Sequence, residues 1–115
     1  MINLLKVGIT VVLWLVAAGV ASAQSPAQVE GGQKVFAAQK CSICHSIAGQ
    51  GNKKGPLEGV GSKLSADEIR QWITNGPEMA AKVKAERKPA MKAYATMPKD
   101  DLEALVAYLQ SLKKG

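Results

Sequence analysis

The sequence predicts a small all-α domain, with about four helices joined by loops. Three observations support this prediction. After residue 23, no alternation of apolar and polar residues is long enough for a convincing strand. Apolar residues instead recur at helical spacing near the C-terminus, and a recognisable helix start occurs at Ser65. The length of 115 residues suits a single domain.

The first residues have the pattern of an export signal. Lys6 is followed by an apolar run at residues 7–20, and Ala21-Ser22-Ala23 has the small residues that signal peptidase accepts. We therefore expect a cleaved signal peptide at residues 1–23, a mature domain at residues 24–115 and a periplasmic location. An uncleaved membrane anchor is the alternative, although the apolar run is shorter than the ~20 residues of a span. Cleavage removes Lys6 and lowers the net charge from +6 to +5.

The first predicted helix covers residues 27–39, because its apolar residues lie roughly on one side. Residues 48–64 hold five glycines and a proline, and are expected to be mostly loop. A second helix begins at Ser65, where Ser65 and Glu68 form a capping box flanked by Leu64 and Ile69 as a hydrophobic staple.

The second helix is expected to end at residues 75–77, the sequence Asn-Gly-Pro. A short third helix at residues 78–86 and an extended loop at residues 87–97 follow. The last helix has the clearest pattern, an apolar stripe of Leu102, Leu105, Val106, Leu109 and Leu112. Acidic residues 100–101 lie in its first turn, and Lys113 and Lys114 are expected in its last turn, where each suits the helix dipole.

Residues 41–45 carry the most specific signal, Cys-Ser-Ile-Cys-His, which is the c-type haem attachment signature. Cys41 and Cys44 lie on one turn, so each thiol can add to a vinyl group on the same porphyrin edge. His45 then lies beneath the iron. A thioredoxin-like pair would need a βαβ setting that is not found, and a zinc site would need about four ligands. A plain disulfide would leave the adjacent histidine unexplained.

Residues 31–113 resemble the small bacterial monohaem class I cytochromes c. The matching segments, in the family's order, are Gly32 to Phe36, the attachment motif, residues 55–61 (GPLEGVG), residues 71–73 (QWI) and residues 102–109 (LEALVAYL). The resemblance implies the class I cytochrome c fold, with about four helices wrapped around one covalently attached haem c per chain. It also implies that the first and last helices cross near Gly32 and Tyr108.

The resemblance further assigns residues around the haem. The Pro56 carbonyl is expected to accept a hydrogen bond from His45 and so orient the imidazole. Leu57 is expected to pack on the porphyrin, and Trp72 to lie against it or reach a propionate. An ordinary core position on a helix face explains Trp72 nearly as well.

The family places a methionine opposite the histidine, on the loop before the last helix. Met97-Pro98 fits the family's usual methionine-proline pair. However, residues 97–102 parallel the capped helix start at residues 64–69, which would make Met97 a staple residue packed against Leu102. We therefore predict Met91 as the sixth iron ligand, with Met97 as the runner-up.

Ligation by histidine and methionine leaves no open iron position, so we expect a one-electron carrier that cycles between Fe(III) and Fe(II), not an enzyme. A haem-based sensor or small peroxidase is the alternative if neither methionine binds iron. A subunit of a membrane complex is a second alternative, if residues 1–23 are retained.

The basic residues suggest acidic redox proteins or membrane redox complexes as transient partners. A solvated surface explains the same charge equally well. No nucleic acid, small-molecule substrate or oligomer is expected. The residues concerned are Lys40, Lys53, Lys54, Lys82, Lys84, Arg87, Lys88 and Lys92.

Overall fold

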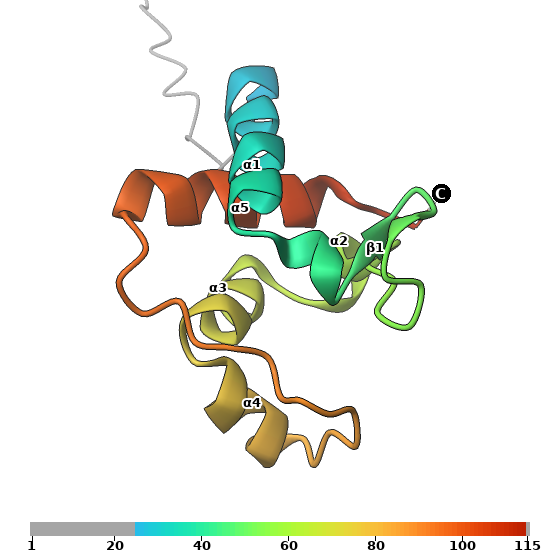
Figure 1. Cartoon of the computed structure of the whole chain (residues 1–115). Helices are drawn as coiled ribbons and strands as arrows, with labels where there is room; N and C mark the ends of the chain where they lie inside the picture. Colours follow the sequence, from blue (N-terminus) through green and yellow to red (C-terminus); the bar gives the residue numbers. More distant parts are fainter. Residues whose placement is uncertain (1–24, 115) are drawn as a thin grey trace, which may run out of the picture.

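The structure is a computed structural model that describes residues 25–114, and within them it is mostly helical (Figure 1). The prediction of an all-α fold is confirmed. The expected signal peptide at residues 1–23 lies outside the described residues. In chain order the elements are α1 (Pro26–Ala38), the 3-10 turn η1 (Cys41–Ile43), β1 (Ser46–Ile47), β2 (Gln50–Gly51), α2 (Val60–Lys63), α3 (Ala66–Thr74), α4 (Gly76–Lys82) and α5 (Lys99–Ser111).

The first and last helices cross, as the resemblance implied (Figure 1). Gly32 of α1 is buried at the crossing, where a Cβ atom would collide with the Ala104 carbonyl oxygen and the Tyr108 Cβ of α5. Beside this contact, the rings of Phe36 and Tyr108 pack edge to face with centroids 6.0 Å apart. The absence of a side chain at Gly32 therefore allows the two helix backbones to approach closely.

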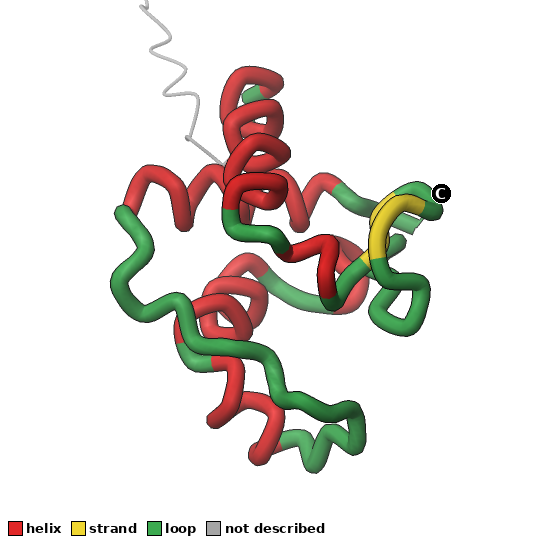
Figure 2. Tube along the Cα trace, viewed as in Figure 1, coloured by secondary structure: helices red, strands yellow, loops and turns green. Residues whose placement is uncertain are grey.

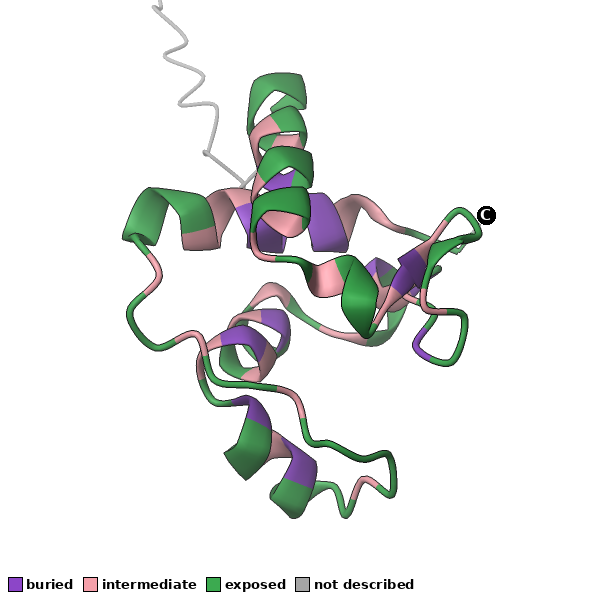
Figure 3. Ribbon diagram, in the orientation of Figure 1, coloured by how far each residue is buried: buried purple, intermediate pink, exposed green. Residues whose placement is uncertain are grey.

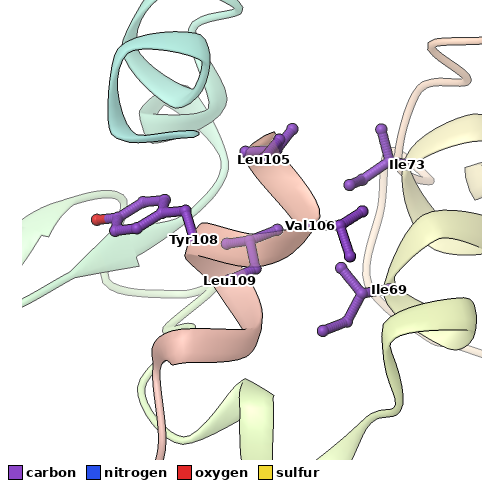
Figure 4. Close-up of a cluster of buried hydrophobic side chains, with 6 residues drawn as sticks. All are labelled: Ile69, Ile73, Leu105, Val106, Tyr108 and Leu109. Atoms are coloured by element: carbon purple, nitrogen blue, oxygen red, sulfur yellow. The ribbon is translucent and has the colours of Figure 1, made fainter. Parts of the chain in front are cut away.

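The core lies between α5 and α3. Ile69 and Ile73 of α3 face the apolar stripe of α5, whereas Tyr108 points away from α3 (Figure 4). In α5 the buried positions are consecutive, Leu105 to Leu109, where α1 crosses the helix, and in α3 they are Ile69 and Ile73 (Figure 3). This arrangement follows from the apolar faces of the amphipathic helices, which are removed from water when they pack together.

The helix boundaries near residue 65 were predicted correctly, and those of the next helix were not. The Ser65 hydroxyl accepts from the Glu68 amide, and the Glu68 carboxylate accepts from the Ser65 amide, each at 3.1 Å. α3 ends at Thr74, as expected. However, α4 spans Gly76–Lys82 instead of residues 78–86, because Pro77 suits the first turn of a helix and Lys84 adopts a left-handed conformation (φ 53°).

Two other expectations need correction. The predicted loop at residues 48–64 contains the second strand of the β1–β2 pair and the short helix α2, which are both too brief to produce a periodic pattern. In addition, α5 ends at Ser111, so Lys113 and Lys114 lie beyond its last turn. Lys113 Nζ instead donates to the Gly61 carbonyl at 2.7 Å, which ties the C-terminal segment to α2.

A long loop, residues 83–98, returns from the end of α4 across α3 to the start of α5 (Figure 2). The Tyr94 amide donates to the Ile73 carbonyl at 2.8 Å and attaches this loop to the end of α3. None of the helices within residues 25–114 is both long and apolar enough to cross a membrane.

Candidate haem-binding site

The attachment motif follows directly from the end of α1. Lys40 adopts a left-handed conformation (φ 57°), which stops the helix and turns the chain into η1. The amides of Cys44 and His45 both donate to the Cys41 carbonyl, at 3.1 and 2.9 Å. This single tight turn places both thiols and the imidazole in one short segment. Both cysteines are free thiols, Cys41 half-buried and Cys44 exposed.

A cavity of about 440 Å³ opens beside this turn. Its volume is typical of a site for a small molecule or cofactor. The walls are mainly apolar and come from α1, α2, α3, α5 and the loop at residues 83–98. The cavity brings together seven residues singled out from the sequence, namely Cys41, Cys44, His45, Leu57, Trp72, Met91 and Met97.

His45 is oriented by a backbone carbonyl, but the expected acceptor was wrong. Its Nδ1 atom lies 3.1 Å from the carbonyl oxygen of Gly55, and Pro56 does not line the cavity. Ser46 and Pro56 form a parallel bridge in which the Ser46 amide donates to the Gly55 carbonyl. Because successive carbonyls of an extended segment point in opposite directions, the carbonyl aimed at His45 is that of Gly55.

The surroundings of His45 favour its neutral form. Burial lowers the pKa of His45 below its usual value, and the positive charge of Arg87 lowers it further, although the contact with the Gly55 carbonyl acts in the opposite direction. Since Nδ1 is engaged by Gly55, Nε2 is the nitrogen left for another ligand. A neutral imidazole with one nitrogen already oriented is the form that binds a metal.

The half-buried thiol also has a shifted pKa. Burial raises the pKa of Cys41, and the nearby Cys44 adds to the effect, while a backbone hydrogen bond opposes it. Cys41 therefore stays a protonated thiol to higher pH than an exposed cysteine does.

Within residues 25–114, no three His, Cys, Asp or Glu side chains are grouped as a metal-ion site.

Both candidate methionines line the cavity, and both are half-buried against the core. Their backbone settings differ. The backbone of Met91 packs on Gly76 at the start of α4, where an added Cβ would collide with the Met91 carbonyl oxygen. Met97 precedes Pro98, which is the N-cap of α5 and provides no side-chain hydrogen bond to the helix. Met97 thus has the position at the helix entrance that the sequence indicated.

Several residues of the site carried no recognisable signal in the sequence. Arg87 was counted only as part of the basic charge, yet its guanidinium lies at the cavity and donates to the Cys44 carbonyl at 2.7 Å. Tyr94 also lines the cavity, and the Lys92 ammonium lies 5.2 Å from the centre of its ring. The contact of Arg87 with Cys44 joins residues 43 positions apart, so no local motif indicates it.

Comparison with known proteins agrees with this geometry. The family model of cytochrome c matches residues 29–113, which include the attachment turn, the cavity walls and α5. The chain belongs to the cytochrome c family. It is a class I monohaem cytochrome c, and membership implies a covalently bound haem c and a haem-based electron carrier.

A curated relative of this cytochrome is cytochrome c oxidase subunit 2 of Alkalihalophilus pseudofirmus, which is 31% identical over 91 residues. The match covers 71% of this chain and 25% of the relative, so the cytochrome spans about a quarter of that protein's length. No solved structure matches the chain.

The residues present fit a haem. The apolar cavity suits a porphyrin, two free thiols lie at its edge, and the imidazole beside them is oriented by the Gly55 carbonyl. A thioether sulfur, from Met91 or Met97, is available on the loop that closes the cavity. This set of donors is the one that c-type cytochromes use.

Proposed function

We propose that this cytochrome is a one-electron carrier whose single haem c is attached through Cys41 and Cys44 and ligated by His45 and Met91. When bound, the haem supplies a reversible Fe(III)/Fe(II) couple. The observation that carries the proposal is that the attachment turn and the loop at residues 83–98, which holds Met91, line one apolar cavity. Two protein ligands leave no iron position open to a substrate, so the protein exchanges electrons and is not an enzyme.

The contacts around His45 support its role as the first ligand. The Gly55 carbonyl holds Nδ1 and thereby restricts rotation of the imidazole. Because burial lowers the pKa of His45, the neutral ring, which is the form that binds iron, is favoured.

The contacts of the loop support Met91 over Met97. The Met91 backbone rests on Gly76, and the Tyr94 amide is held by the Ile73 carbonyl at 2.8 Å. These two contacts restrain the loop beside the cavity that the Met91 side chain lines. Met97 lies immediately before α5, where packing against the helix competes with iron binding.

We further propose that the partners are acidic redox proteins or membrane redox complexes, met transiently in the periplasm by a monomer. Lys40, Arg87 and Lys92 are exposed and also line the cavity, so positive charge surrounds the route to the haem. Ile43, between the two cysteines, is 66% exposed and offers an apolar contact at the same place. Charge of this kind steers a partner into a brief encounter.

The first experiment records the visible spectrum of the oxidised protein, exported with haem-attachment machinery. We expect the weak red band of ferric haem bound by methionine sulfur. Met91→Ala removes the band, whereas Met97→Ala, the matched control, retains it. The reverse pattern would assign Met97 instead. A high-spin spectrum of the wild type, without the sulfur band, would refute the carrier mechanism and favour a sensor or peroxidase.

A second candidate function follows from the relative named as a subunit of cytochrome c oxidase. In that case the domain acts as the electron-entry module of a membrane oxidase, tethered through residues 1–23. Sequencing the N-terminus of the exported protein separates the two candidates. A new N-terminus at Gln24 supports a free carrier, and an intact Met1 supports the tethered module.

A further inference from the structure

Arg87 connects two parts of the molecule that lie far apart in the sequence. It is exposed at the start of the segment that carries Met91, and its Nη2 atom donates to the Cys44 carbonyl at 2.7 Å. Its guanidinium also packs against Gly55, where an added Cβ would collide with the Nη1 atom. Gly55 is the residue whose carbonyl orients His45.

We propose that Arg87 is a positioning residue that fastens the Met91 loop onto the haem attachment turn and holds a positive charge beside His45. The inference rests on the proposed ligation by His45 and Met91. It adds a role for a side chain that contacts neither ligand directly, but contacts Cys44, which precedes His45, and Gly55, whose carbonyl orients it.

The planar guanidinium suits this role because it presents several donors in a rigid fork. One nitrogen donates to the Cys44 carbonyl and the other lies against Gly55. The side chain therefore contacts the residue before His45 and the residue whose carbonyl orients the His45 ring. Met91 follows only four residues later in the chain. A contact at Arg87 therefore limits how far the loop can move away from the iron.

The charge of Arg87 has a separate consequence. A positive charge near the iron disfavours the more positive ferric state and so raises the reduction potential. Arg87 lines the same cavity as His45 and bonds the carbonyl of the preceding residue, so its charge lies close to the proposed iron ligand. The guanidinium thus has two effects. Its hydrogen bond restrains the loop that carries Met91, and its charge raises the reduction potential of the iron.

Three variants of the haem-loaded protein separate these effects. Arg87→Gln removes both charge and fork, Arg87→Lys keeps the charge alone, and Lys88→Gln removes an equal charge from the exposed neighbouring position. The measurements are the reduction potential, the affinity of the ferric protein for added imidazole, which competes with Met91, and amide hydrogen exchange at Tyr94.

For Arg87→Gln we expect a lower reduction potential, because a positive charge near the iron is lost. We also expect faster amide exchange at Tyr94 and about fivefold tighter imidazole binding, because the loss of an exposed charged hydrogen bond loosens the loop that carries Met91. Arg87→Lys is expected to keep a potential near the wild-type value while imidazole still binds more tightly. Lys88→Gln should change imidazole binding and exchange very little.

The inference is overturned if Arg87→Gln matches Lys88→Gln in all three measurements. It is also overturned if only the potential falls, since the loop is then not fastened by Arg87. These results differ from failure of the proposed function, which appears as a missing sulfur band in the wild type. In that event, unchanged Tyr94 exchange in Arg87→Gln still refutes the fastening, and faster exchange still supports it.

Discussion

Arg70 of α3 donates hydrogen bonds to both carboxylate oxygens of Glu103 of α5, with Nε 2.9 Å from Oε1 and Nη2 2.8 Å from Oε2. The two side chains are about one third exposed, at 31% and 36%. The hydrogen bonds from Arg70 hold the pKa of Glu103 below its usual value. This pair therefore closes the edge of the α3–α5 interface whose interior is the apolar core.

The Arg70–Glu103 pair predicts a pH-dependent contribution to stability. The pKa of Glu103 is depressed on folding, so its contribution is present above the unfolded value of about 4.5 and is lost as the pH falls through the folded value. We expect Glu103→Gln to lower the free energy of unfolding by about 1 kcal/mol at neutral pH. Denaturant titrations at several pH values measure the difference.

The control for this prediction is Glu30→Gln, which breaks the exposed pair of Glu30 and Lys34 at 3.9 Å. It should cost little at any pH. A difference between wild type and Glu103→Gln that stays constant down to pH ~3 would contradict the assigned role.

The crossing of α1 and α5 predicts opposite effects for two adjacent glycines. Gly32→Ala is expected to lower the free energy of unfolding by about 1–3 kcal/mol, because its Cβ has no room beside Ala104 and Tyr108. Gly31→Ala should be neutral or stabilising, since its Cβ would lie 3.7 Å from the Ala104 Cβ and alanine favours the helix. Thermal unfolding of both variants tests this, and equal losses would disprove the close crossing.

Gly76 predicts a change in the methionine loop. Gly76→Ala introduces a Cβ where the Met91 and Lys92 carbonyl oxygens lie, so the loop must shift away from α4. We expect a weaker sulfur band in the ferric spectrum and a loss of stability of about 1–3 kcal/mol. Gly31→Ala serves as the control with room for its Cβ. An unaltered band in Gly76→Ala would show that Met91 does not depend on this contact.

The charge around the cavity predicts how ionic strength affects electron transfer. Ferricyanide, an anionic oxidant, should react more slowly as salt is added, and a cationic cobalt complex should react faster. Lys40→Gln is expected to slow the ferricyanide reaction roughly twofold at low salt. Stopped-flow mixing gives the rates.

The matched control is Lys63→Gln, because Lys63 is exposed on α2 and does not line the cavity. The two variants should converge in high salt, where exposed charges are screened. If Lys63→Gln slows the reaction as much as Lys40→Gln, the net charge of the whole protein acts and the rim of the cavity has no special role.

Local patterns in the sequence were sufficient for the features that depend on neighbouring residues. The capping box of Ser65 and Glu68 and the apolar stripe of α5 each involve residues within a few turns, and both are present in the structure. The attachment motif likewise occupies one turn. The crossing near Gly32 and Tyr108 was predicted only because the chain resembles a known family.

The tertiary structure alone decided the features that join distant residues. The family resemblance implied that the Pro56 carbonyl would orient His45, but the structure shows that the Gly55 carbonyl contacts its Nδ1 atom, beside the pairing of Ser46 with Pro56. The hydrogen bond from Arg87 to the Cys44 carbonyl, between residues 43 positions apart, is another such feature. Spacing and periodicity report only short-range geometry, whereas the direction of a carbonyl and the reach of a long side chain depend on how separate segments pack.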